Sequence, residues 1–217
     1  MFKYTKKVYA EAMVNQGIFR LGTLSEYKNI EKHVSEIGDS DEGKMTTLME
    51  GHIINTDNHE SINSPLVKRI LESGHFNFGS GKLEIHANMI NEHTNDLYIF
   101  SASEVLDVSI MKKMNPAYDT CIQIIDTEGF LETLSKCIYS ALEIKDGPHT
   151  NSCVYVERSQ KYSQQNTFHP AFIKSPRFEY QREIRSLWIP KNKPIFPQNI
   201  KCAEARKYCK IGNFPTQ

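Results

Sequence analysis

The stretch FEYQREIRSLWIP (178–190) joins the apolar pattern of a buried strand to a dense set of polar groups. It holds the only tryptophan of the chain, Trp188, and its aliphatic and aromatic residues favour a strand that packs in a core. Side chains two positions apart share one face of a strand. One face is therefore expected to carry three polar side chains, those of Gln181, Glu183 and Arg185. That face meets either a ligand or, as the outer face of a sheet, only solvent.

Other segments with alternating or β-branched and aromatic residues indicate further strands around this one. They are 17–24 (GIFRLGTL), 96–103 (DLYIFSAS), 119–126 (DTCIQIID) and 151–162 (NSCVYVERSQKY), together with a hairpin over 75–90 whose turn is Gly79-Ser80-Gly81.

Three segments favour helices, because a capping residue precedes apolar side chains at helical spacing. The first runs from a cap at Thr5 to a stop at Gly17. Its expected apolar face consists of Val8, Tyr9, Ala12 and Met13. The second covers 25–33, and the third follows a cap at Asp126 or Thr127. The third has the clearest helical period, formed by Phe130, Leu131, Leu134, Ile138 and Leu142.

The expected strands outnumber the helices and do not alternate regularly with them, as a doubly wound parallel sheet would require. The sequence therefore predicts an α+β fold of mixed or antiparallel sheets flanked by helices. No linker rich in proline, glycine or serine divides the chain, so residues 1–217 are expected to form a single domain. Pro190, Pro194 and Pro197 predict an irregular C-terminal segment from about residue 190.

Composition narrows the class of protein. The 217 residues are 39% hydrophobic and carry 26 basic and 26 acidic side chains, so the molecule lacks the positive field of general nucleic-acid binders. No run approaches the ~20 apolar residues of a membrane span, and no secretion signal is visible. We therefore expect a cytoplasmic location and no membrane partner. The five cysteines form no Cys-x-x-Cys pair, and neither a disulfide framework nor a zinc ribbon is expected.

Three polar motifs follow one another along the chain, each in or beside an expected strand. They are Arg20 in IFRLGT, Ser101-Ala-Ser103 in YIFSAS, and Gln181-Arg182-Glu183 in the opening stretch. In type, order and strand context this set resembles the motifs of the mono-ADP-ribosyltransferases, which are glycosyltransferases that use NAD as a substrate. The resemblance implies a split β core of the ADP-ribosyltransferase type.

The resemblance also implies a role for each residue. Arg20 would bind the pyrophosphate of NAD, and Ser101 and Ser103 would position its nicotinamide side. Glu183 would hold the nicotinamide ribose and Gln181 the acceptor, so these two are the expected catalytic residues. Breaking the bond between nicotinamide and ribose develops an oxocarbenium-like charge, which a carboxylate stabilises. A guanidinium suits a diphosphate because it binds anionic oxygens in bidentate fashion.

A second resemblance covers most of the chain from Arg20 to Pro190. The segments 19–43, 98–103, 117–126 and 169–190 are similar to a bacterial family with an early Arg-x-Gly-Thr-Leu strand, an acidic Gly-Asp-x-x-Glu loop and a late Glu-x-Arg strand. Such proteins are often associated with toxins or phage defence. The similarity implies a cytoplasmic bacterial protein and no particular activity. Under the transferase interpretation, the protein would be a toxin or defence effector that modifies a nucleic-acid or protein acceptor and that an inhibitory antitoxin or regulatory partner can restrain.

Two other functions stay open. The acidic loop 36–42 gathers Glu36, Asp39, Asp41 and Glu42, and such carboxylates can hold magnesium or manganese for the hydrolysis of a phosphodiester. No second ligand cluster is visible downstream, and the transferase interpretation calls for no metal ligand. The other alternative is a non-catalytic sensor that binds a nucleotide through Arg20 and residues 181–185.

Overall fold

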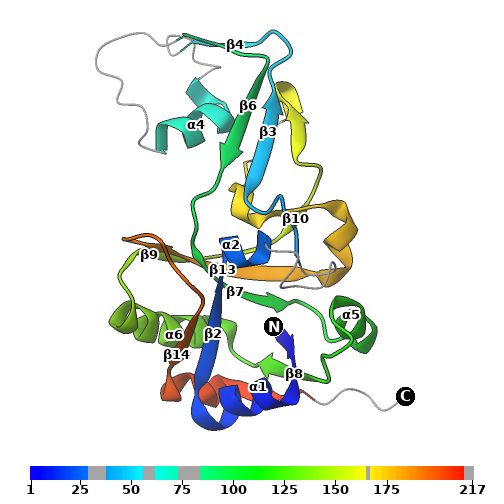
Figure 1. The fold of residues 1–217 in the computed structure, drawn as a ribbon, viewed down its shortest axis with the longest axis vertical. Helices are drawn as coiled ribbons and strands as arrows, with labels where there is room; N and C mark the ends of the chain where they lie inside the picture. Colours follow the sequence, from blue (N-terminus) through cyan, green and yellow to red (C-terminus); the bar gives the residue numbers. More distant parts are fainter. Residues whose placement is uncertain (29–37, 56–61, 73–83, 165–166, 213–217) are drawn as a thin grey trace.

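The computed structural model describes residues 1–28, 38–55, 62–72, 84–164 and 167–212. In this part of the chain the fold is α+β with open and mostly antiparallel sheets, as the sequence predicts. Figure 1 shows a lower part, in which α6 (Thr127–Ala141) and α1 (Lys7–Glu11) flank the main sheet. The upper part is built around β3 (Lys44–Leu48) and β6 (Met89–His93).

The main sheet has eight strands among the described residues, and its pairings are antiparallel. Its continuous path runs through β14 (Gln198–Lys201), β2 (Ile18–Thr23), β7 (Tyr98–Ser103), β1 (Phe2–Thr5), β8 (Thr120–Ile124) and β15 (Cys209–Ile211). In addition, β13 (Glu183–Pro190) pairs with both β7 and β9 (Ile144–Ser152).

The two edges of β7 are paired differently. Along one edge, β13 pairs with the whole of β7, from Tyr98 to Ser103. Along the other edge, β2 pairs with residues 98–99 and β1 pairs with Ser103, so the sheet divides between β2 and β1. None of the strands that the structure describes pairs with residues 100–102 on this edge. The candidate site forms beside this opening between β2 and β1.

The main core lies between the sheet and α6. Trp188 of β13 is fully buried there, and its indole nitrogen donates a hydrogen bond to the Ser135 hydroxyl at 3.2 Å. The ring of Phe130, on α6, packs against those of Phe19 and Phe100, with both pairs of ring centroids 5.4 Å apart. Burial of these large apolar side chains is the main contribution to the stability of the fold.

The opposite face of the sheet carries a smaller apolar cluster. Leu187 of β13 packs there with residues of α2 (Leu24–Lys28) and of the 3-10 helix η3 (Pro170–Phe172). Glu183 and Arg185 lie on the same face as Leu187, because they precede it by an even number of positions. The chain continues over this face through β12 (Ile173–Lys174) and the 3-10 helix η4 (Pro176–Gln181).

The other elements are short. A three-stranded sheet joins β3 to β6 and to β11 (Ser159–Lys161), and two-stranded sheets join β4 (Ile53–Asn55) to β5 (Glu84–His86) and β10 (Val154–Tyr155) to β12. The remaining helices are α4 (Pro65–Glu72), α5 (Val108–Met114), the π-helix η1 (Ala12–Gln16) and the 3-10 helices η2 (Tyr162–Gln164) and η5 (Ala203–Tyr208).

Several predicted elements are confirmed. The strands expected at 96–103 and 119–126 are β7 and β8. The third expected helix is α6, which begins after Asp126, whose carboxylate accepts a hydrogen bond from the amide of Gly129 at 3.0 Å. The first strand and the turn of the hairpin expected over 75–90 lie outside the described residues. So does the end of the helix expected at 25–33, of which α2 is the described part.

The expected apolar face of the first helix is confirmed at Met13, which is buried, but is wrong at Val8 and Tyr9, which are 61% and 59% exposed. Ala10, which the expected face did not include, is buried instead. The helix is not a regular α-helix, because after Glu11 it widens into η1, and a π-helical turn changes the spacing of side chains around the axis. Its predicted stop is confirmed, since Gly17 adopts the left-handed conformation with φ of 67°.

Two predictions about the C-terminal part need correction. Residues 178–181 belong to the 3-10 helix η4 and not to the strand, which begins at Glu183. The segment after residue 190 is also more regular than predicted, because β14 and β15 pair with β2 and β8. Whether the chain is a single domain stays a prediction.

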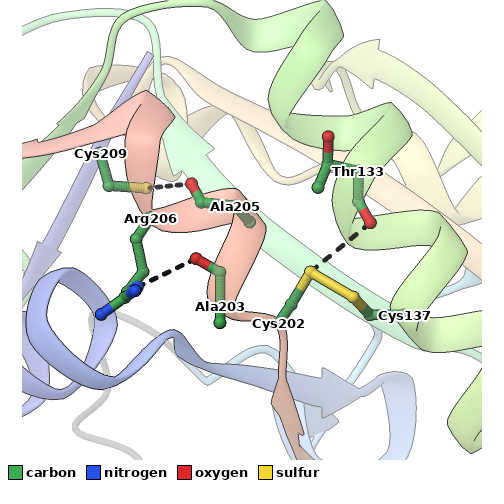
Figure 2. The surroundings of a disulfide bond; sticks show 7 residues. All are labelled: Thr133, Cys137, Cys202, Ala203, Ala205, Arg206 and Cys209. Carbon is green, nitrogen blue, oxygen red and sulfur yellow. Dashed lines mark hydrogen bonds between the residues drawn. A yellow bond between two sulfur atoms is a disulfide. The ribbon is translucent and has the colours of Figure 1, made fainter.

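A disulfide joins two parts of the chain that the sequence did not relate. Cys137 of α6 is bonded to Cys202, which follows β14 and lies 65 positions away (Figure 2). The sequence did not predict this single cross-link, although it is no disulfide framework, since Cys121, Cys153 and Cys209 are free and buried. Disulfides are uncommon in a reducing cytosol. The predicted cytoplasmic location therefore stays a prediction.

We predict that Gly17→Ala destabilises the fold. A Cβ at this position would lie 2.7 Å from the Cys202 carbonyl oxygen and 2.8 Å from the Ala203 Cα, in addition to the strain of a positive φ. We expect a loss of about 2–4 kcal/mol in the free energy of unfolding, measured by urea denaturation. Gly51→Ala is the matched control, because Gly51 also has a positive φ, of 81°, but has open space around it. Equal losses in the two variants would contradict the packing argument.

Candidate functional site

A pocket of about 70 Å³ opens beside the division of the main sheet. Its wall includes Ser101 and Ser103 of β7, Tyr27 of α2, and Tyr118, which precedes β8. Glu183, at the start of β13, lines it from the other edge of β7. The pocket therefore receives side chains from segments that are far apart in the sequence.

The structure brings two of the three predicted motifs together. Glu183 stands directly opposite Ser103 in the ladder between β13 and β7, and Arg185 stands opposite Ser101. The hydroxyl of Ser103 donates a hydrogen bond to the backbone carbonyl of Gln181 at 2.9 Å. The Ser-x-Ser and Gln-x-Glu motifs thus share one side of the pocket.

The third motif residue, Arg20, lies on the neighbouring strand β2 and outside the pocket wall. Its side chain is half exposed and forms an ion pair with Glu26 of α2. Although β2 also pairs with β7, it does so through Gly22 and Thr23, close to the start of α2. Arg20 is therefore near the pocket without contributing to its wall.

The polar face of β13 does not face solvent, so the expectation of a solvent-exposed outer face is wrong. Lys174 donates hydrogen bonds to the side-chain oxygen of Gln181 at 2.7 Å and to Glu183 Oε2 at 2.6 Å. Arg185 donates from Nε to Glu183 Oε1 at 2.8 Å and forms two bonds of 2.8 Å with Glu42. All five side chains are buried. We call Glu42, Lys174, Glu183 and Arg185 the ionic cluster.

The charges of the ionic cluster fix the protonation of Glu183. Burial by itself would raise the pKa of its carboxyl group, but the positive charges of Arg185 and Lys174 outweigh burial and hold the pKa well below its usual range. Glu183 is therefore ionised at neutral pH. The two carboxylates and two cations cancel, so the buried cluster as a whole is neutral, as buried charges must nearly be.

A kink in the backbone orients the Gln-x-Glu motif. Arg182 adopts the left-handed conformation, with φ of 46°, which is uncommon for a residue other than glycine. Because the strand begins only after it, Gln181 and Glu183 both face Lys174, while the side chain of Arg182 turns outward to pair with Glu104. Such strained residues concentrate at functional sites.

The acidic loop has a different role from the one expected for a metal site. Glu42 is fully buried against Arg185, and Asp39 pairs with Arg158 at 2.8 Å. Asp41 pairs with Lys44 at the surface, and Glu36 lies outside the described residues. Among the carboxylates that the structure describes, the loop forms no group with metal-ligand spacing. Through Glu42 the loop instead supplies the ionic cluster with a carboxylate partner for Arg185.

Sequence reasoning missed Lys174 of the ionic cluster, and it assigned Glu42 to a possible metal site rather than to this cluster. Lys174 is seven residues before Gln181 and outside the expected strand, and Glu42 is 143 residues from Arg185. The sequence offered one signal, which is that buried polar side chains need partners. It could not show which charges would be those partners.

Comparison of the chain with protein-family models, with curated proteins and with solved structures gives no match. Within the described residues, no helix is both long enough and apolar enough to cross a membrane.

We predict that Glu42→Ala strongly destabilises the protein. The substitution leaves the buried Arg185 with Glu183 as its one carboxylate partner, which Lys174 also shares. Removing one partner of a buried ion pair costs about 3–5 kcal/mol, which urea denaturation measures. The control is Glu132→Ala, because Glu132 pairs with Lys136 on the exposed face of α6; we expect a far smaller change, since solvent screens such a pair. Similar losses in the two variants would contradict a buried role for Glu42.

Proposed function

We propose that this protein is an NAD-dependent mono-ADP-ribosyltransferase in which Glu183 is the catalytic carboxylate. The observation that carries the proposal is the ionised carboxylate of Glu183 in the wall of a pocket, directly across the sheet from Ser103. The division of the sheet beside this pocket also supports a core of the ADP-ribosyltransferase type.

The environment of Glu183 suits cleavage of the bond between nicotinamide and ribose. As the bond breaks, positive charge develops on the ribose, and a fixed carboxylate stabilises it in the transition state. Each carboxylate oxygen of Glu183 accepts one hydrogen bond from the cluster. A carboxylate offers about four lone-pair sites, so Glu183 can still accept a bond from a ribose hydroxyl.

The size of the pocket limits which part of NAD it receives. At about 70 Å³ it is smaller than the cavity of ~150 Å³ that holds benzene. We therefore assign it to the nicotinamide end, which would enter as the wall side chains adjust, with the rest of NAD outside. Tyr27 and Tyr118 offer aromatic faces to the ring. Arg20, outside the wall, suits the diphosphate.

Gln181 receives a role different from the one that the resemblance implies. Its side chain is buried and its amide oxygen accepts a hydrogen bond from Lys174, so it is poorly placed to hold a macromolecular acceptor. We assign it as a positioning residue that fixes Lys174 and, through Lys174, the orientation of the Glu183 carboxylate.

One observation favours a second candidate, a non-catalytic nucleotide sensor. Because Lys174 and Arg185 offset the charge of Glu183, the carboxylate stabilises an oxocarbenium ion less than a free one would. A sensor would bind NAD without releasing nicotinamide. A metal-dependent nuclease receives less support, because the described acids of the loop 36–42 are paired with cations.

The test uses labelled NAD, the purified protein and a bacterial lysate treated separately with nuclease and protease. Release of nicotinamide, with transfer of label, is expected from the wild type, and the treatment that removes the label names the acceptor as nucleic acid or protein. The toxin or defence role and an inhibitory partner stay predictions until the acceptor is known.

We predict that Glu183→Gln lowers nicotinamide release roughly 100-fold or more, because a neutral amide cannot stabilise the developing charge. Glu104→Gln is the matched control, since Glu104 follows Ser103 directly but pairs with Arg182 at the surface. We expect its turnover to stay within about twofold of the wild type. Thermal melting of both variants checks that they fold.

Equal nicotinamide release by wild type and Glu183→Gln would contradict the role of Glu183. Binding of NAD without release in the wild type would favour the sensor. If added magnesium or manganese instead produces nucleic-acid cleavage, the transferase proposal is wrong.

A further inference from the structure

Lys3 occupies the opening in the main sheet. It lies on β1, and its ammonium group donates a hydrogen bond to the backbone carbonyl of Ser101 at 2.6 Å. Ser101 belongs to the part of β7 that no described strand pairs with on this edge. Lys3 therefore takes the place of a strand partner for this carbonyl, and its side chain also lines the pocket.

Lys3 differs from Lys174 and Glu183, the other charged residues of the pocket wall, in having no ion-pair partner among the described residues. The ionic cluster is neutral, and Arg20 is paired with Glu26. Among the described residues, Lys3 forms no ion pair, although it is partly buried. The ionisable groups that face it from the surrounding elements are those of Arg20, Glu26, Tyr27, Tyr118, Lys174 and Glu183.

A partly buried ammonium group without a counter-ion is unfavourable. Burial lowers the pKa of Lys3 to about 8; Arg20 lowers it as well, whereas Glu183 and Glu26 raise it. An anion in the mouth of the pocket would supply the missing negative charge. The free protein therefore has a positively charged place for an anionic group beside an aromatic pocket.

We propose that Lys3 and Arg20 together form a diphosphate-binding site, in which Lys3 holds the phosphate nearer to the pocket. Lys3 lines the pocket and Arg20 stands outside its wall, and the two cations are close enough for Arg20 to act electrostatically on Lys3. Lys3 would offset the charge of one phosphate, and the half-exposed guanidinium of Arg20, which also pairs with Glu26, would donate hydrogen bonds to the other. The inference rests on the proposed function for the identity of its ligand, but the site can be tested without turnover.

The site has a defined dependence on pH. A bound diphosphate stabilises the charged form of Lys3 and therefore raises its pKa. At a pH at which Lys3 of the free protein has lost its proton, binding requires that the lysine take up a proton. Affinity is therefore constant well below pH 8 and decreases as the pH rises above about 8. Arg20 keeps its charge throughout this range. Burial raises the pKa of Tyr27 to about 12, so this tyrosine stays neutral.

The experiment is isothermal titration of the full chain with ADP-ribose and, in parallel, with NAD, from pH 7 to pH 9.5. Both ligands carry a diphosphate whose charge does not change over this range. We expect Lys3→Met to weaken ADP-ribose binding roughly 10- to 100-fold, the effect of losing one hydrogen bond to a charged group. Lys7→Met, on the exposed surface of α1, is the control and should bind as the wild type does.

Lys3→Arg separates a role in binding from a role in folding. It keeps the positive charge at every pH tested, so we expect it to retain most of the affinity of the wild type at pH 7 and to lose the decrease above pH 8. Thermal melting should show Lys3→Met to be folded, because the substitution removes an unpaired, partly buried charge together with the hydrogen bond to the Ser101 carbonyl, two effects of opposite sign.

The outcomes separate this inference from the proposed function. Lys3-dependent binding of ADP-ribose without nicotinamide release would support the diphosphate site and overturn the transferase. Nicotinamide release with wild-type affinity in Lys3→Met would support the transferase and overturn the role of Lys3. If the wild type binds neither ligand, or if its affinity does not change above pH 8, the diphosphate site is wrong.

Discussion

The buried ion pairs of Arg185 are the interactions on which the rest of the site depends. Through Glu42 they fix the loop before β3, and through Glu183 they fix the start of β13 and, by way of Lys174, β12. Buried ion pairs contribute little net stability compared with apolar residues of the same size, yet losing one partner is costly. Their main effect here is to give the Glu183 carboxylate one orientation and one charge state.

Negative and positive groups occupy different parts of the pocket region. A negative carboxylate lies in its wall, and two cations, Lys3 and Arg20, lie along the opening of the sheet and beyond it. A substrate that develops positive charge at a ribose and carries negative charge on an attached diphosphate has the complementary pattern. The split in the sheet makes this possible, because it frees the edge of β7 at which Lys3 is anchored.

The sequence predicted those features that depend on local patterns. The helical period of α6, the apolar strand β7 and the alternation within β13 were sufficient to place these elements. The sequence could not show that Ser103 and Glu183 lie opposite each other, because that depends on the pairing of two strands about 80 residues apart in the chain. Local pattern could not predict which charges pair. The polar positions of β13 look the same whether they meet water or a buried lysine. The choice of Glu42, Lys174 and Cys202 as partners depends on contacts between segments far apart in the chain.

The central claim is that the pocket beside Glu183 receives the nicotinamide end of NAD. Saturation-transfer difference NMR of NAD with the wild-type protein tests this directly, because it identifies the ligand protons closest to the protein. The account predicts the strongest saturation at the protons of the nicotinamide ring, with weaker saturation at the adenine. Saturation that is strongest at the adenine protons, or none at all, would contradict it.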